Sequence, residues 1–471
     1  MYFHSISSLI IFLPFIFICY PITKRFNVNL SKILLLLFSL LFYSYNNPWF
    51  LIPLLISAIS DFWISKKLIL KNFNSKLTKL SLLIFSFLIN IGLLITFKYS
   101  LLITNTFSFF NDNVIYINLE NLILPAGISF YTFQTLSFSI DSYKGKILKM
   151  PSFLDYVLFV SYFPQLVAGP ILRPEDFFDK NAKSILENNL SDYKNGFTRI
   201  CYGLFLKLFL ADELGILNDS AYQSNFYDLG FLDAWTMSFG FGLQIYFDFS
   251  AYSHMAIGIS KIIGLPIKEN FRFPYSSISS TNFWRNWHIS LSSWVSDYIY
   301  KFFNSKLPLY FFGFIPLLLT WSIMGIWHGA SWRFAVWGAL NGILILLHRI
   351  YKSTKLSNFR ILKIKTISWL LTVFSIMPTW LYFRSTSWVQ ANYLFKTLFN
   401  IQKMELGLRE NYYLIVFLLS ILTALSGLIF NSNKINNILE NDYIKLISSA
   451  FALSLAIIFI NRQTSFIYFQ F

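Results

Sequence analysis

Stretches of about 20 mostly apolar residues recur along almost the whole chain, and each is long enough to cross a bilayer as one helix. They lie near 5–22, 31–46, 49–65, 79–98, 122–142, 153–172, 196–216, 231–262, 307–328, 332–350, 365–383, 412–430 and 444–461. Only 13% of the 471 residues are charged, whereas a soluble domain usually carries about 25%. The sequence therefore predicts an all-α, polytopic integral membrane protein with roughly 10–13 membrane helices, including re-entrant segments. It excludes an ordinary soluble enzyme, a disordered chain and a secreted disulfide scaffold.

Basic residues gather in the loops between these stretches and give the chain a net charge of +16. The segments 66–79 and 349–365 contain lysine and arginine but no acidic residue, and Lys24, Arg25 and Lys32 follow the first stretch. Because such loops stay in the cytoplasm, we expect an N-terminus outside the membrane. The lipid bilayer then accounts for the excess positive charge, and we expect no nucleic acid partner.

Polar side chains interrupt several of the predicted spans. Gln134 lies in a hydroxyl-rich stretch that continues to Asp141. Gln244, Asp248 and Tyr252 follow one another at spacings of four, so they share one face of a helix. Polar groups at membrane depth are costly, and each marks either a functional site or a hydrogen bond between helices. Both interpretations stay open for Gln134, Gln244 and Asp248, which are candidate substrate-binding residues.

Two stretches do not have the pattern of a regular span. Residues 163–170 contain two prolines and a glycine, which predicts broken backbone, either as a cavity wall or as a helix kink. The stretch 231–262 is too long for one span. It predicts either a tilted helix with an extension or two segments that meet near Gly240 and Gly242.

The strongest polar cluster combines histidine with tryptophan. The tryptophans of 284–294 recur with the spacing of one apolar helix face, which predicts a helix at the membrane interface. Arg285 and His288 lie largely away from that face. Farther along the chain, Trp327 and His328 end a long apolar stretch. His328 is a candidate catalytic residue, and Arg285 and Trp327 are candidates for substrate binding.

The chemistry of His328 has two possible interpretations. A histidine at the end of a membrane helix is often a hydrogen-bonded interfacial residue. Neutral imidazole is also the usual general base near pH 7, and Gly329 and Ala330 leave room for a substrate beside the ring. The spacing of histidine, cysteine and acidic residues is not typical of a metal site, so we expect no metal and no bound cofactor.

At these residues the sequence resembles the membrane-bound O-acyltransferase superfamily, and more narrowly the bacterial branch typified by the membrane subunit of alginate O-acetyltransferase. The matching stretches occur in the family's order: 130–134 with Asp141, 163–170, 244–258, 269–274, 284–294 and 324–332. His254, Ser296 and the stretch 301–306 depart from the pattern of the branch. These departures leave the acyl-transfer core intact. They concern which acceptor the protein uses and the surface that would bind a partner protein.

The resemblance implies a single membrane domain over 1–471, built as a helical bundle around a central tunnel. Its motif-bearing core covers about 122–340, and peripheral helices cover 1–121 and 363–471. The family's catalytic histidine, in the Trp-His-Gly motif, corresponds to His328. A second family histidine corresponds to His288, which the resemblance makes a further candidate catalytic residue.

The resemblance also implies an activity and a location. We expect an O-acyltransferase of the bacterial cell (inner) membrane that moves an acyl group, most simply acetyl, from a cytoplasmic thioester donor. Acetyl-CoA or an acyl carrier is the expected donor, and the acceptor is a hydroxyl of a cell-surface polysaccharide such as alginate or of a relay partner. An extracytoplasmic acyltransferase of the alginate-acetylation type is the expected partner.

Two other functions remain as alternatives. D-alanyl transfer to teichoic acid uses the same histidine motif in a sister branch, with an aminoacyl carrier protein as donor. A transporter or lipid-glycan flippase would explain the polar intramembrane groups without catalysis, and it predicts that substitution of His328 is tolerated. A structural scaffold does not explain the Trp-His-Gly cluster.

Overall fold

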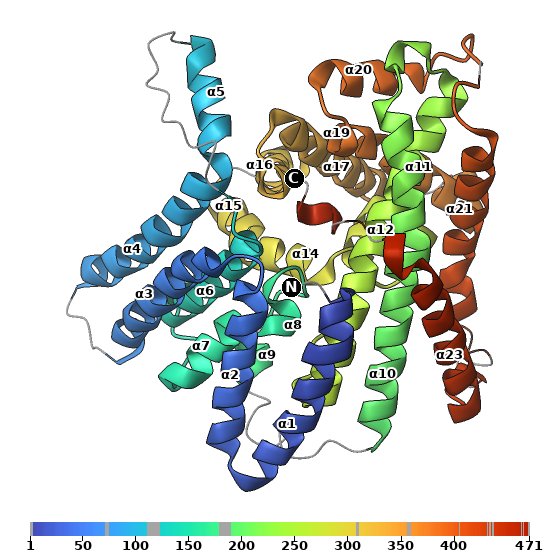
Figure 1. Cartoon of the computed structure of the whole chain (residues 1–471). Coiled ribbons are helices and arrows are strands. Elements are labelled where there is room, and N and C mark those ends of the chain that lie inside the picture. The colour runs from blue at the N-terminus through green and yellow to red at the C-terminus, as the bar shows by residue number, and fades with distance from the viewer. Residues whose placement is uncertain are drawn as a thin grey trace. The chain divides into compact units, whose positions relative to one another are not determined.

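The computed structural model describes residues 3–70, 75–110, 123–178, 190–307, 310–355, 359–404, 406–430, 438–462 and 466–469, and the single positions 432, 435 and 464. All regular elements in these ranges are helical, which confirms the predicted all-α class (Figure 1). Helices long and apolar enough to span a membrane are Ser8–Phe26, Pro48–Leu70, Lys76–Thr104, Trp332–Ser353, Lys365–Arg384, Glu410–Phe430 and Asp442–Arg462. Val28–Ser44 and Gly313–His328 are shorter apolar helices. The chain is a multi-pass membrane protein.

The chain forms two compact units. The first consists of Met1–Ile200 and His254–Lys268, and the second consists of Cys201–Ser253 and Glu269–Phe471. Both units therefore contain segments that are distant in sequence. The predicted histidine cluster belongs entirely to the second unit.

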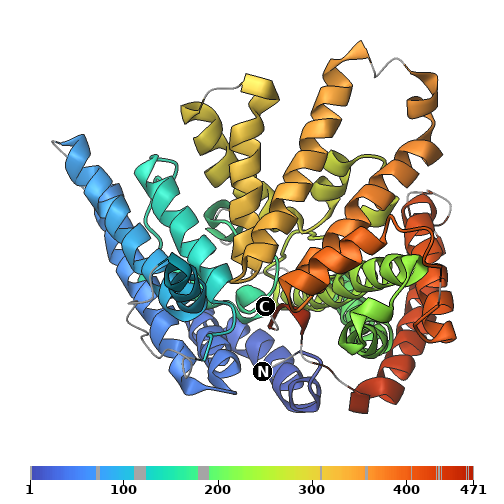
Figure 2. The same ribbon diagram turned by 90° about the horizontal axis from the view of Figure 1, so that it is seen from above.

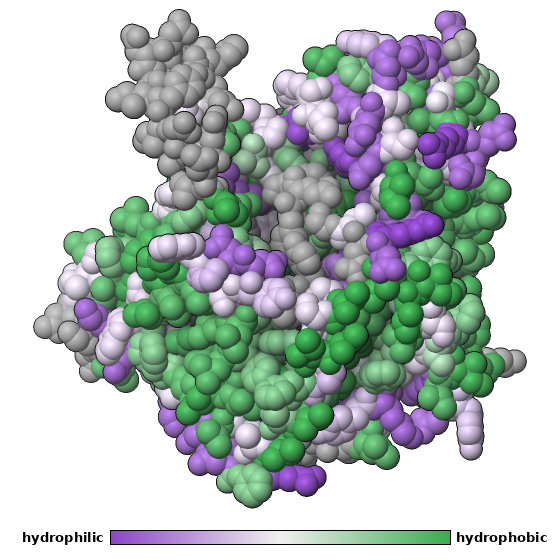
Figure 3. Space-filling model, viewed as in Figure 1, coloured by the Kyte–Doolittle hydropathy of each residue, from purple (hydrophilic) through white to green (hydrophobic). Residues whose placement is uncertain are grey.

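Helices of the first unit expose apolar side chains on their outer faces, as helices in contact with lipid do. Ile10, Phe15, Leu37 and Leu41 are each more than half exposed. Figure 3 shows hydrophobic residues over the surface of α1 to α3. The main helices of this unit are α1 (Leu13–Phe26), α2 (Val28–Ser44), α3 (Leu51–Leu70), α4 (Lys76–Leu94), α6 (Ile128–Tyr143), α7 (Phe153–Ser161) and α10 (Leu190–Phe205).

A buried polar network joins α3, α4 and α6. The Asp61 carboxylate accepts hydrogen bonds from Ser86 Oγ at 2.5 Å, Asn90 Nδ2 at 2.6 Å and Ser139 Oγ at 3.2 Å. All four residues are fully buried. Polar side chains on these apolar helices therefore bond one helix to the next.

The backbone after α7 is broken, as the prolines of 163–170 predict. Helix α7 ends at Ser161, and Tyr162 leaves the helical conformation with ψ 107°. The following helix, α8 (Phe163–Leu166), is a single turn. The buried polar side chain of this turn, Gln165, donates to Gln134 Oε1 at 2.7 Å.

The second unit is organised around α12 (Phe231–Ile263), which continues beyond Ser253 into the first unit. Helix α12 is continuous through Gly240 and Gly242. These glycines permit close packing, because a Cβ at Gly240 would lie 2.3 Å from Tyr412 Oη and one at Gly242 would lie 2.8 Å from Met377 Sδ. Of the two predicted forms of this stretch, the single long helix is the correct one.

The second unit also contains α11 (Asp212–Gln223), α13 (Ser280–Asn286), α14 (Ile289–Val295), α16 (Tyr310–His328), α17 (Trp332–Ser353), α18 (Lys365–Ile376), α19 (Trp380–Arg384), α20 (Trp388–Thr397), α21 (Glu410–Phe430) and α23 (Asp442–Phe459).

Helices α16 and α17 form a tight hairpin and lie side by side in both views (Figures 1 and 2). A Cβ at Gly325 would lie 2.0 Å from the Phe334 carbonyl oxygen, and one at Gly338 would lie 2.1 Å from the Trp321 carbonyl oxygen. Glycine at both positions therefore lets the two backbones approach. Helix α17 begins at the N-cap Ser331, whose side chain accepts from the Arg333 amide. This short connection fixes the end of α16, where His328 lies.

Candidate active site

His328 is buried in an aromatic cage at the end of α16. Its ring centroid lies 4.8 Å from that of Trp327, 5.1 Å from Trp337, 5.4 Å from Phe383 and 5.6 Å from Tyr468. The Trp337 and His328 planes are perpendicular, and His328 is only 4% exposed. Apolar walls of this kind exclude water from an imidazole.

The space beside Gly329 differs from the sequence-based expectation. A Cβ at Gly329 would lie 2.1 Å from Cε2 of Phe334. The ring of Phe334 therefore occupies the room that the glycine provides, so the space expected for a substrate at Gly329 is filled by protein. Gly329 is needed so that Phe334 can pack against the turn between α16 and α17.

The prediction of one continuous helix over 284–294 was also wrong. Helix α13 ends at Asn286, α14 begins at Ile289, and His288 between them has the left-handed φ of 43°. Such a conformation is uncommon for a residue other than glycine and often accompanies function. The tryptophans of this run are buried in protein rather than placed at a lipid interface, because Trp284 is 5% exposed and Trp287 is 1% exposed.

Asn270 holds the break between α13 and α14. Its Oδ1 accepts from the Ser290 amide at 3.2 Å and from Ser290 Oγ at 2.9 Å, and it lies 3.2 Å from His288 Nδ1. Its main-chain carbonyl accepts from the Ile289 amide at 2.9 Å. Since Oδ1 can only accept, His288 Nδ1 carries the proton in this arrangement and Nε2 is the basic nitrogen. Asn270 is a site residue that the sequence analysis did not single out.

Burial controls the charge of His288. It is 1% exposed, its ring meets the Phe249 ring edge-on at 4.5 Å, and its centroid lies 6.4 Å from that of Trp327. Desolvation of the charged form lowers the pKa of His288 from its ordinary 6.5 to about 3. His288 is therefore neutral at physiological pH.

Trp327 lies between the two histidines in these ring contacts, so the structure brings His288, Trp327 and His328 together.

Asp248 belongs to a buried charge cluster. Lys207 Nζ lies 3.0 Å from Asp248 Oδ1 and 2.8 Å from Asp212 Oδ1. The exposed fractions are 1% for Lys207, 1% for Asp212 and 3% for Asp248. Lys207 lies in η5 (Leu206–Ala211), a π-helical turn between α10 and α11. The sequence analysis missed Lys207 and Asp212, although single charges in an apolar stretch were a usable signal.

Gln244 takes part in a second buried network, one helical turn from Asp248. Gln244 Oε1 accepts from Asn218 Nδ2 at 2.8 Å, and Asn218 Oδ1 accepts from the Tyr412 hydroxyl. These bonds connect α12 with α11 and α21. Gln244 is thus engaged with protein groups on the same helix face as Asp248, as the four-residue spacing predicted.

Arg285 and Gln134 are the remaining predicted site residues. Arg285 is exposed, in contrast to its buried neighbours Trp284 and Trp287. Gln134 belongs to the first unit, where its Nε2 donates to the Phe159 carbonyl at 3.0 Å and its Oε1 accepts from Gln165. Arg285 therefore does not share the burial of the histidine pair, and Gln134 is hydrogen-bonded to protein groups of its own unit.

Residues 466–469 form part of the histidine cluster, and the sequence analysis did not identify them. Phe466 is 2% exposed and Ile467 is 1% exposed. The Tyr468 ring centroid lies 4.6 Å from that of Phe249 and 5.6 Å from that of His328. The only signal in the sequence was an aromatic run that follows the last apolar stretch.

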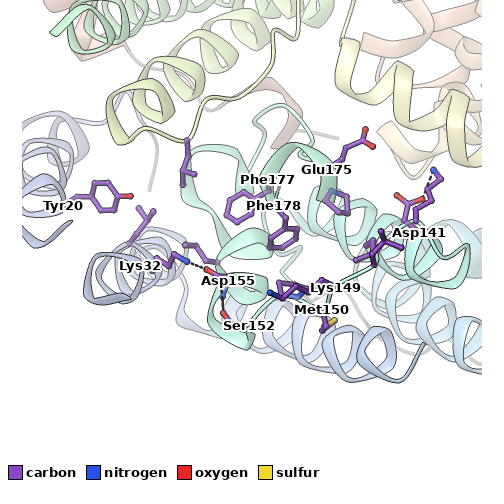
Figure 4. Close-up of a pocket in the computed structure, with 18 residues that line it drawn as sticks. Tyr20, Lys32, Asp141, Lys149, Met150, Ser152, Asp155, Glu175, Phe177 and Phe178 are labelled. Carbon is purple, nitrogen blue, oxygen red and sulfur yellow. Dashed lines mark hydrogen bonds and ion pairs between the residues drawn. The ribbon is translucent and has the colours of Figure 1, made fainter. Parts of the chain in front are cut away.

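A separate pocket of about 870 Å³ lies in the first unit (Figure 4). Lys32, Lys146 and Lys149 line it together with Asp141, Asp155 and Glu175. Lys32 pairs with Asp155 at 2.6 Å, and Lys146 pairs with Asp141 at 3.1 Å. Positive and negative side chains therefore balance in its wall, which does not favour an anionic ligand.

The polytopic helical fold, with a buried histidine pair, defines the class as multi-pass membrane proteins, and comparison with known proteins identifies the family. The model of the membrane-bound O-acyltransferase family matches residues 65–386. A peptidoglycan O-acetyltransferase of Helicobacter pylori is 30% identical over 98% of this chain and 95% of its own length. A probable alginate O-acetylase of Azotobacter vinelandii is 37% identical over 56% of this chain, and the match spans about half (52%) of that relative's length. A teichoic acid D-alanyltransferase of Bacillus subtilis is 26% identical over 50% of this chain and 61% of its own length.

The chain belongs to the membrane-bound O-acyltransferase family. The resemblance seen in the sequence motifs is thereby confirmed. The family match begins at Ser65, within α3, and continues past Arg384, so it includes His288, His328 and the hairpin that carries His328.

Proposed function

We propose that this protein transfers an acyl group, most simply acetyl, from a cytoplasmic thioester to a hydroxyl of a cell-surface glycan or of a relay partner. The observation that carries the proposal is the buried His328 in its aromatic cage, within a chain of the O-acyltransferase family. Neutral His328 accepts the proton of the attacking hydroxyl as its oxygen bonds to the thioester carbonyl carbon. The C–S bond then breaks, and the leaving thiolate receives the proton from the imidazolium. General-base help of this kind is worth about 10²–10⁴-fold in rate.

A peptidoglycan hydroxyl is the first acceptor to test. The H. pylori relative, named as a peptidoglycan O-acetyltransferase, matches nearly end to end, whereas the alginate relatives match over part of their length. The teichoic acid relatives are less similar, at 25–26% identity. Acetyl-CoA or an acyl carrier protein is the proposed donor.

We place this activity in the bacterial cytoplasmic membrane with the N-terminus outside. Basic loops at 66–79 and 349–365 support this orientation. Donor and acceptor then lie on opposite sides of the bilayer. An extracytoplasmic acyltransferase is the proposed partner, since it would pass the acyl group to the polymer.

The test is the ester content of the cell-surface glycan in wild type, a deletion strain and a strain with His328→Ala at matched membrane expression. We expect both altered strains to lose the same ester, and its identity names the acyl group. His348→Ala is the matched control, because this histidine bonds Thr281 Oγ1 at 2.8 Å on α13 and lies outside the aromatic cage.

The other outcomes separate the alternatives. Loss of the ester in the deletion strain alone would make His328 structural and favour a transporter or flippase. Loss of D-alanine from teichoic acid, with peptidoglycan unchanged, would assign the chain to the D-alanyl branch. Unchanged esters in all strains would contradict the proposed acceptors.

A further inference from the structure

The buried charge cluster of Lys207, Asp212 and Asp248 is unbalanced by itself. One ammonium group faces two carboxylates, and all three side chains are at most 3% exposed. Uncompensated buried charge is costly unless other donors satisfy the carboxylate oxygens. Lysine offers three N–H groups, while two carboxylates present four oxygens, so the cluster needs donors from elsewhere in the chain.

The missing donors come from residues near 464–469. Thr464 Oγ1 donates to Asp212 Oδ1 at 2.5 Å, and the Ile467 main-chain amide donates to Asp248 Oδ2 at 2.7 Å. These partners are separated from the charge cluster by 252 and 219 positions in the chain. Hydrogen bonds to charged groups are about twice as strong as neutral ones, so both contacts hold this distant segment firmly.

The same segment reaches the proposed catalytic histidine. Phe466 contacts the Tyr252 ring at 5.3 Å, and Tyr468 lies beside Phe249 and His328. Ile467, which is anchored by Asp248, is the residue between these two aromatic side chains. The position of the Asp248 carboxylate therefore determines where both rings lie.

We infer that Lys207, Asp212 and Asp248 are positioning residues that anchor the segment 464–469 in the active-site wall. In this role the Asp248 carboxylate binds groups of the protein rather than the substrate. The segment then belongs to the wall of the active site. The anchoring is independent of the reaction, whereas its effect on acyl transfer rests on the proposed function. The π-helical turn η5 supports the assignment, because such turns are frequent at functional sites and this one carries Lys207.

Thiol labelling tests the anchor without any activity assay. Cys19→Ser and Cys201→Ser remove the two natural cysteines, and Ile467→Cys then places one thiol in the segment. This substitution keeps the main-chain amide that donates to Asp248. We expect slow labelling by a membrane-permeant maleimide in the purified full chain. Asp248→Ala in this background should speed labelling at least about tenfold, because it removes a hydrogen bond to a charged group.

Two further variants keep the test decisive. Asp248→Asn retains an oxygen for the Ile467 amide but loses the charge that pairs with Lys207, so a smaller increase in labelling is expected. Lys301→Met is the control: it removes an ion pair with Asp297 that lies on neither α12 nor the segment. This substitution should leave the labelling rate unchanged. If Asp248→Ala and Asp248→Asn both remain folded in size-exclusion chromatography and label at the parent rate, the anchor is overturned.

Acyl transfer by wild type and by the Asp248 variants in the natural background separates this inference from the proposed function. With all cysteines and Ile467 intact, we expect Asp248→Asn to lower kcat at least about tenfold with His328 still present. Faster labelling together with no transfer by wild type would sustain the anchor and refute the function. Normal transfer by wild type and by both Asp248 variants, with unchanged labelling, would sustain the function and refute the anchor.

Discussion

At the scale of single residues, burial makes His288 a neutral side chain whose proton position is set by Asn270. Its pKa is lowered to about 3, so between pH 6.5 and pH 3 the unfolded chain binds a proton that the folded chain does not. Stability therefore falls as the pH falls through this window, by up to about 1.4 kcal/mol per pH unit from this residue. We expect His288→Gln to reduce the loss of thermal stability between pH 7 and pH 5, measured in detergent. An unchanged pH dependence would show that His288 is not desolvated.

Asn270 gives a second prediction at the same scale. Asn270→Asp places a carboxylate opposite His288 Nδ1, where a negative charge favours the imidazolium and raises the pKa of His288. We expect the pH profile of kcat/KM to gain an inflection on its acid side, while Asn270→Ser gains none. Identical profiles for the two variants would exclude titration of His288 from the reaction.

At the scale of elements, the α16–α17 hairpin depends on close contact between two backbones. Gly325→Ala would put a Cβ 2.0 Å from the Phe334 carbonyl oxygen, so the helices must move apart at a cost of about 1–3 kcal/mol. We expect a lower unfolding midpoint and weaker acyl transfer, because His328 lies three residues farther along α16. Gly92→Ala on α4 is the control: its Cβ would meet nothing within 4 Å, and it should stabilise the protein by about 0.5–1 kcal/mol. Equal effects of the two substitutions would contradict this account of the hairpin.

The elements also show how far sequence reasoning reaches. Hydrophobic stretches predict most membrane helices because lipid requires about 20 apolar residues, and the prolines of 163–170 predict the break after α7. The end of α13 at Asn286 has no such local signal, because it depends on Asn270, which is distant in sequence. The contacts of Thr464 and Ile467 with the charge cluster are equally non-local. Periodicity reports the face of a helix, whereas tertiary contacts decide where a helix stops and which polar groups meet.

At the scale of the whole molecule, the basic loops predict how the chain is oriented in the membrane. Leu77→Cys, near the start of α4, and Ser353→Cys, at the end of α17, each add one exposed thiol to a chain without natural cysteines. We expect an impermeant maleimide to label both in inverted vesicles and neither in intact spheroplasts, because lysine- and arginine-rich loops remain in the cytoplasm. Labelling of either thiol from outside would reverse the proposed topology.

The length of α12 has a consequence for how deep the chemistry takes place. Asp233 near its start and Lys261 near its end are separated by 28 residues, which at 1.5 Å per residue is about 42 Å, the thickness of a bilayer with its headgroups. Asp248 lies close to halfway between them, about 20 Å of helix from each end. The proposed acyl transfer, in the site whose wall Asp248 anchors, would then take place about 20 Å of helix from each end of α12. The proposed donor would have to extend a flexible arm of about that reach, and the proposed acceptor hydroxyl would have to descend a similar distance from the other side.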